Sequence, residues 1–189
     1  ADVLTQAFLN DPFYQYAIPD RALRLTQLPP FFATCLAYGL RYGHVWVAGR
    51  DAEAIGGAAF GYVFPEGYFT PERTSEVGFD AIDRMLGDAS DRITGFSRSV
   101  EAEMQPFLPA RSFFVDLIGT RPHVQGVGIG AAMLSEIAAY AKSIGLPVAL
   151  WTETPDALRF YQRHGYVLAA QGMYQPARAK WWALSRPTG

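Results

Sequence analysis

The stretch from Gln125 to Leu134 holds the residues with the clearest chemical meaning in this chain. It reads Q-G-V-G-I-G-A-A-M-L, so glycines alternate with small apolar residues just before an amphipathic helical pattern. An extended apolar run, Ser112 to Thr120, precedes it. A strand, a glycine-rich turn and a helix N-terminus in this order expose backbone N–H groups beside the positive end of a helix dipole. Glycine lets a phosphate approach this backbone closely, so the stretch predicts an anion-binding site.

The composition indicates a folded domain and disfavours several other classes of protein. The chain has 189 residues, half of them apolar, which is enough for one domain (residues 1–189) with a substantial core. The formal net charge of −2 disfavours nucleic acid as a partner, because phosphate backbones bind basic surfaces. No apolar run approaches a membrane span, and no signal peptide pattern opens the sequence, so we expect no membrane partner and a cytoplasmic location.

Cysteine and histidine usage gives no sign of a metal site. The single cysteine, Cys35, excludes an intrachain disulfide and is flanked by apolar residues, so we expect it in the core. The histidines are His44, His123 and His164, and their spacing does not match a metal site. We therefore expect no bound metal.

Periodicity and turn residues predict the elements that must hold the glycine turn in place. We expect helices at residues 1–10, 20–42, 76–106, 126–143 and 155–164. Pro29-Pro30 should break or kink the second of these, and residues 76–106 should form two helices that separate near Gly87. We expect strands at residues 44–48, 55–63, 111–120, 147–152, 166–174 and 178–184, with a turn at 49–51 and a loop at 64–74. The second half alternates strand and helix and ends in an antiparallel pair. This order predicts an α/β or α+β domain with a mixed central sheet flanked by helices.

The glycine turn alone is compatible with two other interpretations. Gly126-x-Gly128-x-x-Ala131 formally fits a dinucleotide-binding fingerprint, and Glu153 could take the place of its ribose-binding acid. However, the residues from Thr120 to Gln125 separate the strand from the first glycine, where the fingerprint needs a tight turn, and too little chain follows Glu153 for a second half-sheet. The dinucleotide interpretation is therefore disfavoured. A turn that serves only packing is the other alternative.

Two motifs together resemble the GNAT superfamily of acyl-CoA-dependent N-acyltransferases. Gln125-x-x-Gly128-x-Gly130 matches its Q/R-x-x-G-x-G/A motif, after a strand-then-proline lead-in at residues 118–124. Downstream, the sequence A-L-R-F-Y-Q-R-H-G-Y at residues 157–166 resembles its A-x-x-F-Y-x-x-x-G-F signature. The resemblance is close over residues 112–166 and is strongest to puromycin N-acetyltransferase-like members, which share H-V-W-V-A at residues 44–48. The family's first strand is not visible before residue 1, which is consistent with a missing N-terminal segment.

The resemblance implies that acetyl-CoA is the cosubstrate and that it follows a defined path. Its pyrophosphate would lie on the N–H groups of residues 127–131, and its pantetheine arm would pair with the strand edge at residues 118–120. This path requires the strands at 112–120 and 147–152 to splay, and it points the thioester carbonyl at the N–H of Ile118, as an oxyanion contact. The implied binding residues are Ile118, Gly119, Thr120, Gln125, Gly126, Val127, Gly128, Ile129, Gly130, Ala131 and Thr154. Thr154 replaces the asparagine that many members carry.

The resemblance also implies a general acid, Tyr161, which would protonate the departing CoA thiolate. A phenol with a pKa of about 10 is protonated at neutral pH and can donate that proton. The alternative is that Tyr161 is a packed aromatic residue next to Phe160.

The general base is predicted on the central strand. By a period of two, Phe114, Asp116, Ile118 and Thr120 share one face. Asp116 is a lone carboxylate in an apolar run, where burial of a charge is costly unless it has a partner or a function. A structural aspartate bonded to a neighbouring loop is the alternative. Glu153, Glu66 and a water chain are further alternatives for the base.

Acceptor specificity is expected from the N-terminal helices, the loop at 64–74 and the last hairpin. These segments carry aromatic residues that could form the core or line an apolar slot: Phe13, Tyr14, Tyr16, Phe31, Phe32, Tyr38, Tyr42, Phe64, Tyr68, Phe69, Tyr174, Trp181 and Trp182. An apolar slot with one carboxylate suits a small-molecule amine with an apolar body. Puromycin itself is not implied, because Trp151 stands where puromycin-acetylating members tend to carry glutamate.

We therefore expect an N-acetyltransferase that acts on a primary amine of a small molecule. The alternatives are a protein or peptide N-acetyltransferase and a non-catalytic acyl-CoA-binding module. The last two strands offer an edge through which a homodimer could form.

Overall fold

The computed structural model describes residues 1–49 and 54–188. Its helices are α1 (Asp2–Phe8), α2 (Pro12–Ala17), α3 (Arg21–Tyr42), α4 (Pro71–Glu76), α5 (Phe79–Leu86), α6 (Asp88–Met104), α7 (Ile129–Ser143) and α8 (Pro155–Arg163). Its strands are β1 (His44–Gly49), β2 (Ile55–Phe64), β3 (Ser112–Thr120), β4 (Val148–Thr152), β5 (Val167–Tyr174) and β6 (Ala179–Arg186). Single 3-10 turns lie at Gln105–Phe107, Pro122–Val124 and Gln175–Ala177.

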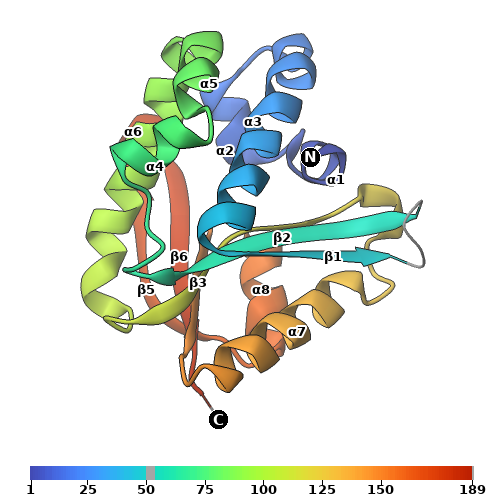
Figure 1. The fold of residues 1–189 in the computed structure, drawn as a ribbon, viewed down its shortest axis with the longest axis vertical. Helices are drawn as coiled ribbons and strands as arrows, with labels where there is room; N and C mark the ends of the chain where they lie inside the picture. The colour runs from blue at the N-terminus through green and yellow to red at the C-terminus, as the bar shows by residue number, and fades with distance from the viewer. Residues whose placement is uncertain (50–53, 189) are drawn as a thin grey trace.

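The strands form a mixed, strongly twisted sheet in the order β1-β2-β3-β4-β6-β5. Within the described residues the pairing of β3 with β4 is parallel and the other pairings are antiparallel. Helices α1 to α5 lie on one side of β1 and β2, and α7 and α8 lie on the other, whereas α6 runs along β5, as Figure 1 shows. This arrangement confirms the expected mixed sheet flanked by helices.

Strands β3 and β4 separate soon after they begin. They pair only at Phe113 with Val148 and at Phe114 with Ala149, although β3 continues to Thr120 and β4 to Thr152. The expected splay is therefore confirmed, and it leaves the edge of β3 that faces β4 open over the second half of the strand.

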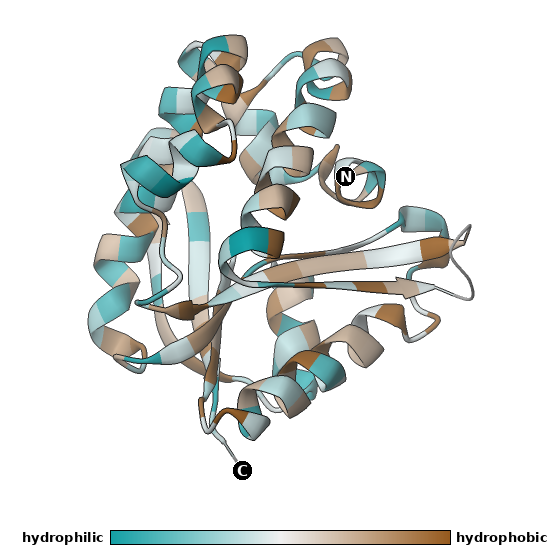
Figure 2. Ribbon diagram, in the orientation of Figure 1, coloured by the Kyte–Doolittle hydropathy of each residue, from teal (hydrophilic) through white to brown (hydrophobic). Residues whose placement is uncertain are grey.

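Two apolar clusters cover the two faces of the sheet. One joins the N-terminal helices and α6 to the sheet, with Phe32, Phe60 and Phe96 fully buried. The other joins α7 and α8 to the opposite face through residues such as Phe113 and Ile137. Figure 2 shows apolar residues along β2 and hydrophilic residues on α4, which lies at the surface. Cys35 is buried in the first cluster, as expected.

The N-terminal helices differ from the expectation in two ways. Helix α3 is continuous through Pro29 and Pro30, so the expected break is wrong. A proline removes one helical hydrogen bond, but burial of Leu28, Phe31 and Phe32 around this point stabilises the helical path. The sequence also missed α2, which begins at Pro12 with the Asp11 side chain as its N-cap.

Other differences lie in the loops. The expected loop at 64–74 contains the start of α4, which is capped by Thr70. Helix α7 begins at Ile129 rather than at Gly126, because the glycines before it have left-handed backbone angles. The predicted turn at 49–51 extends beyond the described residues. No helix in residues 1–49 and 54–188 is long and apolar enough to cross a membrane.

Candidate active site

The glycine turn has the geometry of an anion-binding site. Gly126 and Gly128 have φ angles of 82° and 93°, which residues with a Cβ rarely adopt. Gly128 is the N-cap of α7, and the next N–H groups, up to Ala131, precede the first intrahelical bond, which Ala132 donates to Gly128. The turn is open to solvent, since Val127 is 71% exposed. An anion can therefore reach several free N–H groups at the positive end of a helix.

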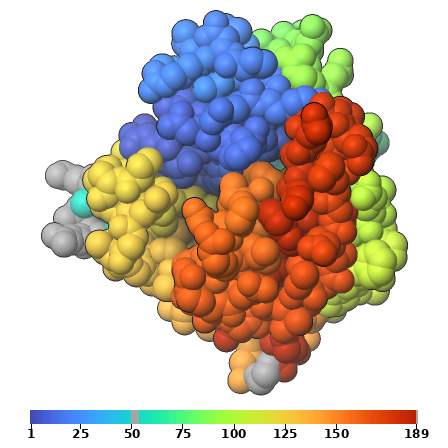
Figure 3. Space-filling model, turned by 180° about the vertical axis from the view of Figure 1, so that it is seen from behind, coloured from blue at the N-terminus to red at the C-terminus, as the bar shows by residue number. Residues whose placement is uncertain are grey.

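The turn is held against the end of β3 and lies at the surface. The Gln125 amide donates a hydrogen bond to the carbonyl of Thr120 at 3.4 Å, which ties the turn to the strand. A Cβ on Gly130 would lie 3.2 Å from the Phe160 ring, so the first turn of α7 packs closely on α8. In Figure 3 the segment around the turn (yellow) adjoins the N-terminal helices (blue) and the region of α8 (orange).

A β-bulge in β3 changes which side chains share a face. Phe60 pairs with Leu117 and Gly61 pairs with Val115, so Asp116 is an extra residue in the ladder between β2 and β3. Beyond the bulge, Leu117 packs with Phe114 in the first cluster, whereas Ile118 packs in the second. The expectation that Phe114, Asp116, Ile118 and Thr120 all share one face is therefore wrong, because the extra residue shifts the alternation by one and separates Phe114 from Ile118.

The backbone of Ile118 faces the open edge of β3. The backbone N–H of Arg121 donates a hydrogen bond to the carbonyl oxygen of Gly56 in β2 at 2.8 Å. Because every second residue of a strand directs its backbone N–H and C=O to the same neighbour, Gly119 also directs its N–H and C=O to β2. Ile118 and Thr120 must then direct their N–H and C=O groups away from β2, toward the gap between β3 and β4. This is the orientation that an extended ligand needs to pair with the strand and that an oxyanion contact at Ile118 needs.

The gap between β3 and β4 holds a cavity of about 190 Å³ that brings the predicted catalytic residues together. Asp116 and Ile118 line it from β3, and Tyr161 lines it from α8. Glu153 and Thr154, just after β4, also line it. The Thr154 hydroxyl accepts a hydrogen bond from the N–H of Ala157 at 3.3 Å, so it serves as the N-cap of α8 and retains one donor for a ligand.

Asp116 has the electrostatic environment of a general base. Burial raises the pKa of its carboxyl to about 8, the negative charge of Glu101 acts in the same direction, and a hydrogen bond with Tyr62 opposes both. A carboxylate with this pKa takes up a proton readily near neutral pH, which an ordinary aspartate does not. Tyr62 is on β2 and Glu101 is on α6, so the sheet and a helix together set this pKa.

Tyr161 lies in the same cavity as a protonated phenol. It is only 7% exposed, and burial raises its pKa, with smaller contributions from Tyr166 and Glu153. Its ring is tilted against Phe160, with the ring centroids 5.5 Å apart. The cavity contact agrees with the predicted role as an acid, and that role stays a prediction.

The alternative bases are less suited to proton abstraction. Glu153 shares a hydrogen bond with Asp11, and burial together with the Asp11 charge raises its pKa well above the usual value, so Glu153 holds the proton of the pair. Glu66 is exposed and forms an ion pair with Arg111 at 2.7 Å, and its pKa is lowered. A lowered pKa makes Glu66 a weak base. Among the described residues no group of three or more His, Cys, Asp or Glu side chains could hold a metal ion.

Sequence reasoning did not assign roles to Glu101, Tyr62 or Asp11. Glu101 lies beside the apolar stripe of α6 that contains Val100 and Met104, and this position could have marked it as half-buried. Nothing in the sequence indicates that Asp11 meets Glu153, because the two residues come from elements far apart in the chain.

Comparison with known proteins agrees with this fold. Residues 81–168 match the family model of the acetyltransferase (GNAT) domain. A histone acetyltransferase HPA2 and related acetyltransferase from Corynebacterium glutamicum aligns with 100% of this chain and 88% of its own, at 20% identity and a TM-score of 0.67. An agmatine N-acetyltransferase aligns over 96% and 89%, at 16% identity and a TM-score of 0.60.

A polyamine N-acetyltransferase from Drosophila melanogaster has the same fold. It aligns with 78% of this chain and 76% of its own, at 16% identity and a TM-score of 0.57. The TM-scores of these structures show a shared fold at low sequence identity. The glycine turn and α8 both lie inside the region that the family model matches. Residues 81–168 are therefore similar to a GNAT acetyltransferase domain, and the chain as a whole shares the fold of these enzymes.

Proposed function

We infer that the protein is an acetyl-CoA-dependent N-acetyltransferase that acts on a primary amine of a small molecule. The observation that carries this inference is the meeting of Asp116, Ile118 and Tyr161 in one cavity between β3 and β4. A base, an oxyanion donor and an acid are the three groups that direct acyl transfer from a thioester to an amine requires.

The path of acetyl-CoA follows from the open backbone groups. The turn from Gln125 to Ala131 supplies N–H groups for the pyrophosphate, and Gly126 and Gly128 keep these groups accessible. The pantetheine arm pairs with Ile118, Gly119 and Thr120 along the edge of β3 that β4 leaves open. Thr154 lies opposite, at the start of α8, where its hydroxyl can donate to the arm.

The reaction is a single displacement in which the chain supplies the proton transfers. Asp116, directly or through water, takes a proton from the acceptor ammonium. The free amine nitrogen then forms a bond to the acetyl carbon while the N–H of Ile118 stabilises the negative charge on the carbonyl oxygen. The carbon–sulfur bond breaks, and Tyr161 donates its proton to the departing thiolate. The acylated nitrogen then loses its second proton through water, which returns a proton to the Tyr161 phenolate. The products are the acetylated amine and coenzyme A.

A small-molecule acceptor is favoured over a protein tail by the shape of the site. A second cavity of about 510 Å³ adjoins Glu101, which also lines the cavity between β3 and β4. Its volume is in the range of sites that enclose a small ligand.

Binding of acetyl-CoA to wild type, Gly128→Ala and Gly145→Ala, measured by calorimetry, tests the proposal. Both glycines have positive φ, and a Cβ at either position meets no atom within 4 Å, so the two variants carry similar backbone strain of about 1 kcal/mol. Only Gly128 lies in the turn; Gly145 follows the other end of α7. We expect weaker binding in Gly128→Ala and unchanged binding in Gly145→Ala.

A parallel assay measures release of the coenzyme A thiol with a panel of primary amines. Amine-dependent thiol release together with an acetylated amine in the mass spectrum supports the proposal. An absence of acetyl-CoA binding by the wild-type protein would refute it.

A further inference from the structure

The larger cavity lies between α6, the loop before α4 and the paired strands β2 and β3. It has a volume of about 510 Å³. Its walls are mainly apolar and aromatic, with Tyr62, Phe64, Tyr68 and Phe114 among them. The ring of Tyr68 packs edge-on against Phe64 and Tyr62, at centroid distances of 5.7 and 6.3 Å. The cavity is therefore suited to a flat or bulky apolar group.

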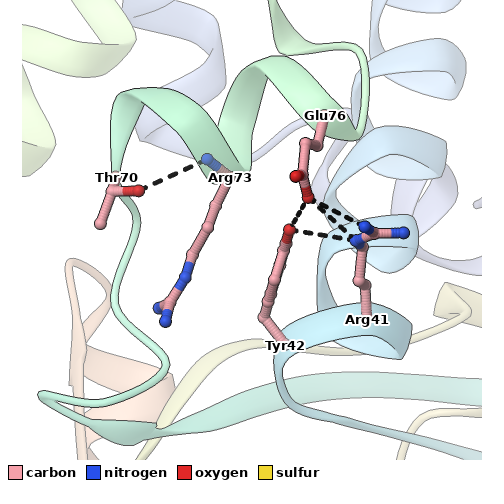
Figure 4. Close-up of polar contacts among 5 residues, drawn as sticks. All are labelled: Arg41, Tyr42, Thr70, Arg73 and Glu76. Atoms are coloured by element: carbon pink, nitrogen blue, oxygen red, sulfur yellow. Dashed lines mark hydrogen bonds and ion pairs between the residues drawn. The ribbon is translucent and has the colours of Figure 1, made fainter.

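The loop wall of this cavity is fixed in place by polar contacts. The Arg73 guanidinium donates to the carbonyls of Glu66 at 2.7 Å and Tyr68 at 3.1 Å. Figure 4 shows the Arg73 side chain directed away from Glu76, which contacts Arg41 and Tyr42, and the Arg73 guanidinium lies over the Tyr42 ring at 5.1 Å from its centroid. The contacts of Glu76 join α4 to the end of α3. The charge of Arg73 is used to hold the loop, and the wall is formed before a ligand binds.

One carboxylate connects the two cavities. Glu101 lines both, and its side chain accepts a hydrogen bond from the Tyr68 hydroxyl at 2.5 Å. Within residues 1–49 and 54–188 it has no ion-pair partner within 4.0 Å, although Arg98 lies one turn earlier on α6. Burial raises the pKa of Glu101, and the Tyr68 hydrogen bond and the Arg98 charge oppose this. A cation bound between Glu101 and Asp116 would offset the unfavourable free energy of burying negative charge on both carboxylates.

We propose that the acceptor is a primary amine on an aromatic or similarly bulky apolar body, with the body in the larger cavity and the ammonium bound by Glu101 beside Asp116. This proposal rests on the acetyltransferase function proposed above. Glu101 acts as the ammonium-binding residue, and Asp116 receives the proton. Slender aliphatic amines such as putrescine would leave most of the apolar walls uncovered, so they should be poor acceptors.

The test compares phenethylamine, putrescine and agmatine as acceptors for wild type, Glu101→Gln and Glu103→Gln. Glu103 lies on the same helix but is exposed, and it lines neither cavity, so it is the matched control. We expect the highest kcat/KM with phenethylamine. Loss of a charge-assisted hydrogen bond should raise the KM of Glu101→Gln for phenethylamine roughly tenfold to hundredfold, with a smaller change in kcat. Glu103→Gln should behave like the wild type.

A second variant tests the larger cavity without altering its charge. Ala102 is exposed on α6 and lines this cavity, so Ala102→Trp fills space from a position that tolerates a large side chain. We expect it to weaken phenethylamine binding, measured by calorimetry with and without coenzyme A, and to leave acetyl-CoA binding unchanged.

The outcomes separate this proposal from the function on which it rests. A protein that binds acetyl-CoA but prefers putrescine or agmatine, or whose KM for phenethylamine is unchanged in Glu101→Gln, overturns the acceptor proposal and leaves the acetyltransferase intact. A protein that does not bind acetyl-CoA and acetylates none of the amines overturns both.

Discussion

The ionisation of Asp116 should control the pH dependence of the reaction. Burial and the charge of Glu101 raise its pKa to about 8, so the base is mostly protonated at neutral pH. With this value, the ionised fraction is 1/(1 + 10) or about 9% at pH 7, and 1/(1 + 0.1) or about 91% at pH 9. The contribution of the base to kcat/KM should therefore rise about tenfold between these two pH values and then level off.

Replacement of Asp116 by Asn isolates this contribution. Asparagine has nearly the same shape but takes up no proton, and loss of a general base typically costs a factor of about 10² to 10⁴ in rate. The acceptor ammonium also titrates, and it does so equally for both proteins. The ratio of wild-type to Asp116→Asn kcat/KM cancels that effect and should increase with an apparent pKa of about 8.

The assay is steady-state thiol release at saturating acetyl-CoA from pH 6 to pH 10, with circular dichroism to confirm that both proteins are folded. Glu153→Gln is the control, because Glu153 lines the same cavity but holds the proton of its pair with Asp11. A ratio that does not change with pH, or a tenfold drop at pH 9 for Glu153→Gln but none for Asp116→Asn, would refute the assignment of the base.

Three further predictions follow from the same groups. Tyr161→Phe should lower kcat by about 10² with acetyl-CoA affinity nearly unchanged. Tyr166→Phe removes a buried hydroxyl that has no hydrogen-bond partner among the described residues, so it should retain turnover, and equal kcat values for the two variants would exclude Tyr161 as the acid. The pKa of Asp116 is about 8 in the fold and 3.8 in the unfolded chain, so its ionisation lowers the free energy of unfolding by on the order of 5 kcal/mol as pH rises from about 4 to about 8. In urea unfolding, Asp116→Asn should therefore gain stability relative to wild type across this pH range. A stability difference that does not change with pH would contradict this. Asp11→Ala should destabilise the fold by about 1 kcal/mol or more, since it removes the cap of α2 and the partner of Glu153, and an unchanged Tm would contradict both roles.

Local patterns made much of the site predictable. The alternation of apolar residues marks β3, and the glycines before Ile129 and the proline at the start of α8 mark the two helix N-termini that border the site. Each of these signals lies within a few residues, so the sequence displays it directly. The prolines of α3 are also a local signal, and they gave a wrong prediction of a helix break. The helix stays continuous because of packing against residues distant in the sequence, which the local pattern does not display.

The remaining features depend on contacts between distant segments. The bulge at Asp116 arises from the register with β2 and has no mark in the run F-F-V-D-L-I, so the face of Ile118 could not be derived by counting. The pKa of Asp116 depends on Tyr62 and Glu101, which approach it only in the folded chain. The larger cavity likewise forms where α6 meets the loop before α4.

Thermal melting with acetyl-CoA, coenzyme A, NAD and NADP in parallel tests the central claim most directly. A ligand that binds only the folded state, at about 100 times its Kd, adds roughly 2.7 kcal/mol of stability, which raises the Tm of a domain of this size by several degrees. The account predicts such a rise with acetyl-CoA and coenzyme A and none with NAD or NADP. A rise with NAD or NADP and none with acetyl-CoA would contradict it and would make the turn at Gly126 to Ala131 a dinucleotide-binding site.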